Sequence, residues 1–276
     1  MKYIAIYFLL LVVYAVPSLQ AEPQSVAEIN SSFRSMACNA DYLYILTKEN
    51  SILKISIKDG TQKTISLENP SESTFTDLSV LNDQIYLCQS ANSDILVLNE
   101  KSPKKGFKKI SCDPKTIKGI VNVSTSKNEM IIRNTDNDVY QVNGKGVTRK
   151  IVSGAAFISR GFPLIAASVD FQKSWQVTVE GKTLSYSGNK EEPVAQLMPI
   201  GQDPQNRLIF LEVTGDGTFN SKYYLTSYAK EKFERLSELN SPHLFATRIA
   251  VMNDKGDVYR ARKDGERNLI VVEKLQ

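Results

Sequence analysis

The chain has 276 residues, a formal net charge of +4, one histidine and three cysteines. This mild positive charge is not the electrostatic footprint of a nucleic-acid-binding protein. A single histidine excludes zinc sites built on several histidines, and it limits any Ser-His-Asp or Cys-His hydrolase to His243.

Residues 1–21 predict a cleaved secretory signal peptide. Lys2 supplies a positive charge, residues 4–16 are an apolar run, and Ala21 precedes a polar stretch. The run is shorter than the ~18 apolar residues that indicate a spanning helix, which favours cleavage over an uncleaved anchor. No later stretch is long or apolar enough to span a bilayer. We therefore expect residues 22–276 to form one secreted domain, extracellular or periplasmic, that has no transmembrane segment and is a monomer.

A strand–turn–strand pattern recurs six times along the rest of the chain. In the first copy, residues 42–46 are all apolar, which is typical of a strand buried on both faces, and residues 52–58 alternate as a half-exposed strand does. The turns between them are rich in Asn, Asp and Gly, which form tight hairpins. A further strand precedes each copy, for example at residues 76–81 and 119–124. The copies start at intervals of roughly 40 residues and occupy residues 41–57, 83–98, 128–142, 173–186, 207–226 and 247–261.

This repeat predicts an all-β fold, a single β-propeller with six blades of four antiparallel strands. We expect the ring to close by pairing residues 35–38 with the last strand, residues 269–273. A β-sandwich or two smaller barrels are the alternatives. Trp175 shares its strand face with two valines, so we expect it to pack between blades. The irregular fourth copy and an insertion near residues 218–222 of the fifth predict longer loops, which in repeat proteins often lie on the binding face.

The cysteines and two sequons bear on secretion. In an oxidising compartment two of the three cysteines are expected to pair, and Cys88 with Cys112 is the first choice because both fall in one repeat. Cys38 with Cys88 is an alternative, as are buried free thiols. Asn30 and Asn122 each begin an Asn-x-Ser sequon, so both are predicted glycosylation sites if the host is a eukaryote.

A lysine-rich segment is the most distinctive local feature of the chain. Such a cluster can attract heparin-like glycans, anionic lipid or nucleic acid, and secretion argues against nucleic acid. The alternative is a solvated hairpin, because lysines also protect the exposed edges of sheets. The binding candidates are Lys101, Lys104, Lys105, Lys108 and Lys109.

Acidic pairs are the candidates for a metal site, and the best are Asp136 with Asp138 and Asp254 with Asp257. Neither matches the calcium-binding loop of EF-hands, and both fall where the fold needs hairpin turns. We therefore expect turn chemistry here, and neither a metal site nor a cofactor.

Residues 175–186 and 249–260, and in part residues 130–140, resemble the tectonin repeat of tachylectin-like propellers. Each has an aromatic or apolar strand, an Asn- or Gly-containing turn and a second strand that carries a tyrosine. The resemblance implies recognition of glycans without catalysis. We expect a secreted, non-catalytic module that binds a protein or a glycan. The alternatives are a Ca²⁺-dependent lactonase or phosphotriesterase with the metal on the propeller axis, and a structural or assembly partner.

Overall fold

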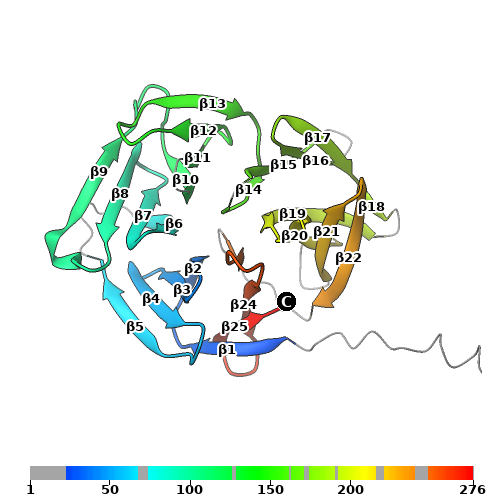
Figure 1. The fold of residues 1–276 in the computed structure, drawn as a ribbon, viewed down its shortest axis with the longest axis horizontal. Helices are drawn as coiled ribbons and strands as arrows, with labels where there is room; N and C mark the ends of the chain where they lie inside the picture. The colour runs from blue at the N-terminus through cyan, green and yellow to red at the C-terminus, as the bar shows by residue number, and fades with distance from the viewer. Residues whose placement is uncertain are drawn as a thin grey trace, which may run out of the picture.

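A computed structural model describes residues 23–67, 74–125, 129–161, 163–170, 174–189, 192–215, 221–239 and 248–275. Six antiparallel sheets stand around a common axis as the blades of a closed propeller (Figure 1). The predicted six-bladed fold is thus confirmed. The predicted signal peptide, residues 1–21, lies outside the described residues. Within those residues, no helix is long and apolar enough to cross a membrane.

The first three blades each contain four strands that run in order from the axis to the rim. Blade 1 consists of β2 (Phe33–Cys38), β3 (Tyr42–Thr47), β4 (Ser51–Ser56) and β5 (Gln62–Ser66). Blade 2 consists of β6 (Phe75–Leu81), β7 (Gln84–Gln89), β8 (Asp94–Asn99) and β9 (Phe107–Ser111), with the 3-10 turn η1 (Pro103–Lys105) before β9. Blade 3 consists of β10 (Ile120–Thr125), β11 (Met130–Asn134), β12 (Val139–Val142) and β13 (Thr148–Val152).

The other three blades complete the ring. Blade 4 consists of β14 (Phe157–Ile158), β15 (Ile165–Val169), β16 (Trp175–Val179) and β17 (Lys182–Tyr186). Blade 5 consists of the two-residue β18 (Gly188–Asn189), β19 (Glu192–Gln202), β20 (Leu208–Thr214), β21 (Tyr223–Ala229) and β22 (Lys232–Leu239). Blade 6 consists of β23 (Ala250–Met252), β24 (Val258–Asp264), β25 (Leu269–Lys274) and β1 (Gln24–Ile29).

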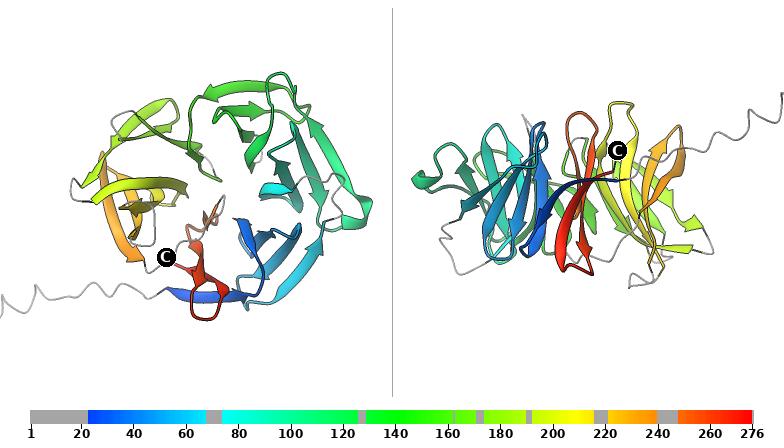
Figure 2. Two further views of the ribbon diagram at one scale, coloured as in Figure 1. Left: turned by 180° about the vertical axis from the view of Figure 1, so that it is seen from behind. Right: turned by 90° about the horizontal axis from the view of Figure 1, so that it is seen from below.

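Burial falls from the axis to the rim within a blade. In blade 1, β3 buries every residue after its first, whereas β5 buries only Ile65. The strands run across the thickness of the disc (Figure 2), so each inner strand has a neighbouring blade on both faces. Because an outer strand has only part of one face covered, it alternates between apolar and polar residues as the sequence predicts.

The ring closes through β1, and the predicted closing pair was wrong. β1 pairs with β25 in antiparallel register, with Ala27 opposite Val272 and Ile29 opposite Ile270, and forms the outer strand of blade 6 (Figure 1). Residues 35–38 instead belong to β2, the innermost strand of blade 1. The difference has a physical reason, because β1 has the one-sided burial of a rim strand and β2 is almost completely buried.

The strand–turn–strand copies occupy different places in different blades. Copies one, two and three are the second and third strands of their blades, as expected, whereas copy five (β20 and β21) is the third and fourth of the five strands of blade 5. Copy four is the third and fourth strands of blade 4 (β16 and β17), and copy six is the first and second strands of blade 6 (β23 and β24). Each copy is an antiparallel hairpin with a similar turn, so the strand–turn–strand pattern alone does not fix a hairpin's distance from the axis.

Trp175 packs between blades 4 and 5, as predicted. Its side chain is 3% exposed, and its indole Nε1 donates a 3.0 Å hydrogen bond to the carbonyl of Val194 on β19. The ring of Phe157 stacks on it at a centroid distance of 5.9 Å. The indole thus joins two blades through apolar packing and one directed bond, which is how a buried tryptophan is normally satisfied.

Candidate functional site

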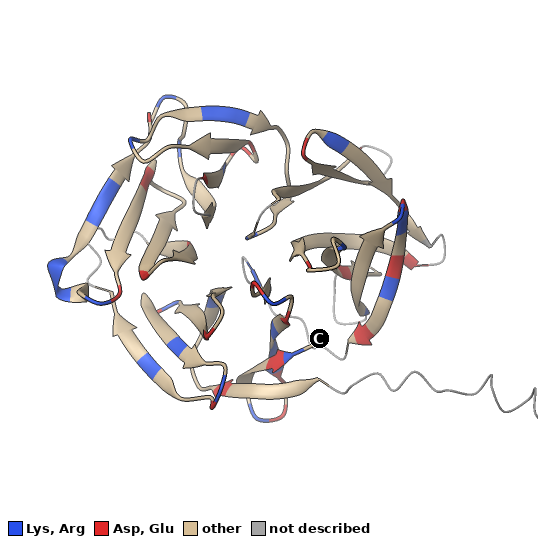
Figure 3. Ribbon diagram, viewed as in Figure 1, with Lys and Arg blue, Asp and Glu red and all other residues tan. Residues whose placement is uncertain are grey.

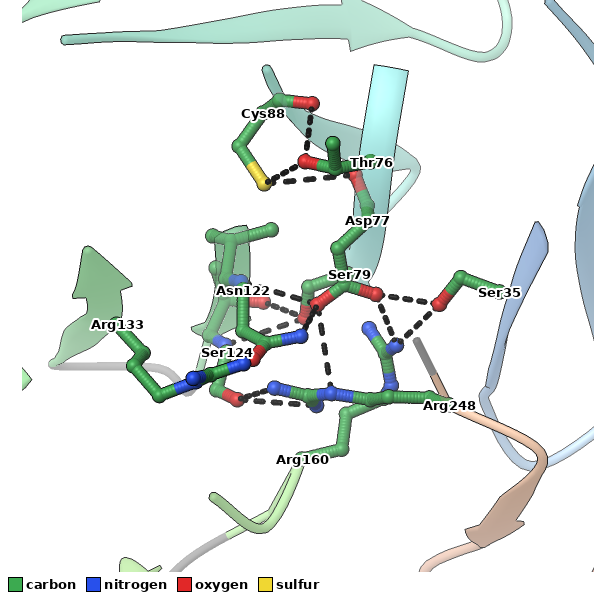
Figure 4. Close-up of polar contacts among 12 residues, drawn as sticks. Ser35, Thr76, Asp77, Ser79, Cys88, Asn122, Ser124, Arg133, Arg160 and Arg248 are labelled. Atoms are coloured by element: carbon green, nitrogen blue, oxygen red, sulfur yellow. Dashed lines mark hydrogen bonds and ion pairs between the residues drawn. The ribbon is translucent and has the colours of Figure 1, made fainter. Parts of the chain in front are cut away.

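The innermost strands of blades 1, 2 and 3 carry a polar residue at the same point. In each, the pairing register shifts by one residue just before it, between Phe33 and Ser35, Phe75 and Asp77, and Ile120 and Asn122. Such a bulge inserts one extra residue and redirects the side chains that follow it. Figure 4 shows the result, with Ser35, Asp77 and Asn122 from three blades turned toward one another.

The carboxylate of Asp77 lies at the centre of this group and is completely buried. Its Oδ1 accepts a hydrogen bond from the Ser35 hydroxyl. Its Oδ2 accepts bonds from the Asn122 amide at 3.2 Å and from the backbone N–H of Val123 at 3.1 Å. Three blades are therefore tied together through one acidic side chain.

Two arginines from the other half of the ring reach the same carboxylate. Arg160, which follows β14, places Nη2 2.8 Å from Oδ1 of Asp77. Arg248, which precedes β23, places Nε 3.4 Å from Oδ2. Both side chains are more than nine-tenths buried. Arg248 is also fixed by a parallel backbone bridge to Ser35, which brings blades 1 and 6 together beside the axis.

The remaining contacts form a second layer around the arginines. Nη1 and Nη2 of Arg248 donate to the hydroxyl of Ser124 at 3.3 and 3.2 Å, and that hydroxyl donates to the carbonyl of Ser159 at 2.8 Å. Arg133 donates through Nε to Oδ1 of Asn122 at 2.8 Å. We refer to Ser35, Asp77, Asn122, Ser124, Arg133, Arg160 and Arg248 as the axial cluster.

The electrostatics of the axial cluster suit recognition better than proton transfer. Burial opposes ionisation of Asp77, but the charges of Arg160 and Arg248 outweigh it and hold the pKa of the carboxyl below its usual range. Burial lowers the pKa of Arg248 to about 9, although Asp77 acts in the opposite direction. Burial raises the pKa of the Cys88 thiol, beside the cluster, to about 12. At neutral pH these groups are carboxylate, guanidinium and neutral thiol.

The lysine-rich segment lies on the rim of blade 2, away from the axis. Its five lysines are exposed. They lie on the turn after β8, on η1 and on β9, where Figure 3 shows blue segments of the ribbon on the outside of the ring. Lys101 pairs with Asp83 at 2.6 Å and Lys109 with Asp94 at 2.5 Å. Lys104, with Lys63 of blade 1, lines a hollow of about 260 Å³ between the rims of the two blades. Anion binding by these lysines stays a prediction.

All three cysteines are free thiols in the structure. Cys88 and Cys112 are buried in the same hydrophobic cluster, but Cys88 pairs with Ile95, and Ile95 pairs in turn with Ile110. Two strand spacings of ~4.8 Å therefore separate the strand of Cys88 from the strand that leads to Cys112. Since disulfide-bonded cysteines have Cα atoms no more than ~7 Å apart, this pairing would require the backbone to move.

The two sequons differ sharply in accessibility. Asn30 is exposed at the end of β1, and its glycosylation stays a prediction. Asn122 is 3% exposed and is hydrogen-bonded to Asp77 and Arg133. A glycan cannot attach to an amide nitrogen held in this way, so glycosylation of Asn122 is incompatible with the folded structure.

Both acidic pairs lie in hairpin turns, where turn chemistry explains them. Oδ1 of Asn134 accepts from the N–H groups of Asp136 and Asp138, and Oδ1 of Asn253 accepts from that of Asp257. The described residues contain no group of three His, Cys, Asp or Glu side chains that could hold a metal ion. His243 lies outside them.

Sequence reasoning missed the axial cluster, although part of its signal was present. Ser35, Asp77 and Asn122 each precede the start of a repeat copy by the same interval, and each is a polar residue within an apolar inner strand. That coincidence could have placed three of the residues on the axis. Arg160 follows β14 and Arg248 precedes β23, and only the folded ring brings the two together.

No protein-family model matches the chain, and no curated protein sequence does. Solved propeller structures are similar in fold. The WD40 β-propeller domain of Doa1 is 11% identical, with a TM-score of 0.53 over 91% of this chain and 96% of that one. Streptogramin B lyase is 13% identical, with a TM-score of 0.54 over 91% and 96%. The PQQ-bound aldose sugar dehydrogenase of Streptomyces coelicolor is 10% identical, with a TM-score of 0.58 over 91% and 96%. These identities show the propeller fold alone, and the likeness to tectonin propellers is not shown.

Proposed function

We propose that the protein is a secreted, non-catalytic binding module that recognises a protein or glycan ligand at its axial cluster. One observation carries the proposal, namely that two arginines from different blades converge on a single buried carboxylate, while a third, Arg133, is hydrogen-bonded to Asn122 beside it. Guanidinium groups are suited to recognising carboxylate, sulfate and phosphate groups because their N–H donors are planar and permanently charged. A ring of blades that holds such donors in place provides a preorganised binding site.

The ionisable groups of the cluster argue against catalysis. A general base works best with a pKa near the working pH, whereas both oxygens of Asp77 are occupied and its pKa is lowered. A cysteine nucleophile needs a thiolate, whereas the pKa of Cys88 is raised to about 12. Neither group is prepared for acid–base or nucleophilic chemistry.

The Ca²⁺-dependent lactonase or phosphotriesterase is the alternative, and the charge of the axis disfavours it. Such an enzyme needs oxygen ligands of net negative charge around a divalent cation. The one carboxylate of the axial cluster is already ion-paired with Arg160 and Arg248. Their positive charges would repel a calcium ion placed beside Asp77.

Ligand capture tests the proposal. Mature protein, residues 22–276, is immobilised and exposed to a glycan array and to extracellular fluid of the source organism, in parallel with Arg160→Gln and Arg149→Gln. Arg149 is an exposed arginine on β13 and serves as the matched control. We expect wild type and the control to retain the same ligand and Arg160→Gln to lose it. Capture that is indifferent to Arg160→Gln would refute the axial site.

Two further measurements address the alternative and the localisation. Elemental analysis after extensive dialysis is expected to find no stoichiometric calcium. One retained Ca²⁺ per chain, with turnover of a lactone or phosphotriester, would replace the proposal with the enzyme. For secretion, expression of residues 1–276 is expected to release a protein whose N-terminus is Glu22, determined by N-terminal sequencing of the medium or periplasm.

A further inference from the structure

The charges of the axial cluster do not balance. Arg133, Arg160 and Arg248 contribute three positive charges, and within the described residues of the cluster Asp77 contributes the only negative one. A buried charge is costly unless it is paired. Burial lowers the pKa of Arg133 and of Arg248, and for Arg248 the neighbouring charges of Arg160 and Arg133 act in the same direction. A bound anion would reduce the imbalance.

Arg160 also has donors without acceptors. Its Nη2 is used by Asp77 and by Ser35, the latter at 3.3 Å. Its Nε and Nη1 are buried and have no hydrogen-bond partner among the described residues, although the side chain is only 9% exposed. An unpaired donor of a charged group costs more than that of a neutral one. These two nitrogens therefore need an acceptor that the described chain does not supply.

A cavity lies at this point and has a volume of about 20 Å³. A water molecule needs ~10–15 Å³ by the same measure, so the cavity has room for one or two water-sized atoms, and the rest of any ligand must lie outside it. This fits the two oxygens of a carboxylate better than the four of a phosphate or sulfate. The polar part of the wall is formed by Asn122, Arg160 and Arg248, and the rest is apolar, including Phe157 and Met198. The apolar residues suit the carbon atom next to the carboxylate, which would lie against them where the ligand leaves the cavity.

We propose that the axial cavity binds a carboxylate group, with Arg160 as its main donor and Arg248 as the second charge facing it. The carboxylate belongs either to a small free acid or to an acidic side chain that a partner inserts along the axis. This inference rests on the proposed function, in that both use the axial cluster, but it specifies the chemical group that is recognised.

Binding is measured directly on the mature protein. Sodium acetate and propionate are titrated by isothermal calorimetry at constant ionic strength, with chloride and sulfate in parallel. Carboxylates in a partner are represented by the capped peptide acetyl-Gly-Gly-Glu-amide and its Gln counterpart. We expect saturable binding of a carboxylate, at least tenfold tighter than chloride or sulfate. Binding of acetate identifies a small acid, and binding of the Glu peptide alone identifies a partner's side chain.

Variants test the assignment. Arg160→Gln is expected to weaken carboxylate binding at least tenfold, and Arg149→Gln to leave it unchanged. Because Arg160→Gln can unfold the ring, Arg160→Lys, which keeps the charge near Asp77 but loses the guanidinium donors, is measured as well. Saturation-transfer NMR on each folded variant supplies a second readout of bound acetate.

The outcomes separate this inference from the proposed function. The carboxylate site is overturned if neither acetate, propionate nor the Glu peptide binds saturably, or if sulfate and chloride bind as tightly as the carboxylate that binds best. If ligand capture still depends on Arg160 in that case, the proposed function stands without it. If acetate binds and no Arg160-dependent ligand is captured, the carboxylate site stands and the proposed function fails.

Discussion

The substitution Asp77→Asn isolates the negative charge at the centre of the ring. Asparagine keeps the shape of the side chain, but it removes the charge that Arg160 and Arg248 share and turns an amide donor toward them. Removing one partner of a buried ion pair costs about 3–5 kcal/mol, because the other charge stays buried without compensation. Asp77 is completely buried and faces two arginines, so we expect a loss of free energy of unfolding in this range.

The expected loss is large compared with the stability of a domain, which is typically about 5–15 kcal/mol. Urea unfolding followed by far-ultraviolet circular dichroism measures it as a lowered midpoint. In a chain of this size, 1 kcal/mol shifts the melting temperature by about 2–4 °C. We therefore expect Asp77→Asn to melt roughly 6–20 °C below wild type.

The matched control is Asp83→Asn. It makes the same chemical change at an aspartate that pairs with Lys101 at 2.6 Å on the exposed rim. Exposed ion pairs contribute about 0–1 kcal/mol, so this variant should stay close to wild type. If the free energy of unfolding of Asp77→Asn also lies within about 1 kcal/mol of wild type, the reasoning is refuted. The ion pairs of Asp77 would then contribute no more than exposed pairs do.

The pH dependence gives an independent check on the same residue. The pKa of Asp77 is lower in the folded than in the unfolded state, so the unfolded chain binds more protons. The stability gained from its ionisation is therefore fully present above the unfolded pKa of ~3.9 and is lost as pH falls through the lowered folded pKa. Asp77→Asn cannot lose this contribution. The stability difference between wild type and the variant should shrink as pH is lowered below ~4, and a constant difference would contradict the assignment.

Three further predictions concern the rest of the ring. The thiols of Cys88 and Cys112 should resist Ellman's reagent in the native protein, because burial raises their pKa to about 12 and about 11, and unfolding should release three thiols per chain unless a disulfide forms. Deleting residues 22–29 should lower the free energy of unfolding by at least ~2–4 kcal/mol, because the burial of two apolar side chains of β1 is lost. It should also broaden the urea transition. Glu212→Gln should lower the free energy of unfolding, measured with urea, by about 3 kcal/mol, because the completely buried Glu212 is bonded to Arg235 and Thr226. A loss below about 1 kcal/mol would show that solvent screens the Glu212–Arg235 ion pair.

The propeller could be predicted because its evidence is local. Each hairpin is specified within about 20 residues by its apolar strands and the turn between them. The turns contain Asn, Asp and Gly, which form tight hairpins in any protein. Asn134 and Asn253, for example, close their turns by accepting backbone N–H bonds, whatever the rest of the chain does. Six such hairpins at a regular interval leave few folds other than a propeller.

The place of each strand within the ring was harder to predict. β16 and β17 form the same strand–turn–strand copy as β3 and β4, yet they lie one position closer to the rim. The closing strand raises the same difficulty, because its partner β25 is at the other end of the chain. The local sequence pattern specifies which residues of a strand face a core. The strand's distance from the axis depends on how many strands of the same blade lie between it and the axis, and this depends on distant parts of the chain.

The axial cluster lies at the limit of sequence reasoning, because its residues are linked only by the closure of the ring. Asp77 and Arg160 come from blades 2 and 4, and Arg248 precedes blade 6. The converging inner strands could be filled by apolar side chains at equal or greater stability. A purely structural role accounts for the bonds of Asp77, but, within the described residues, not for the excess of positive charge in the axial cluster or for the two nitrogens of Arg160 that have no acceptor there. Recognition of an anionic group accounts for both, and this asymmetry is the strongest argument for placing the function on the axis.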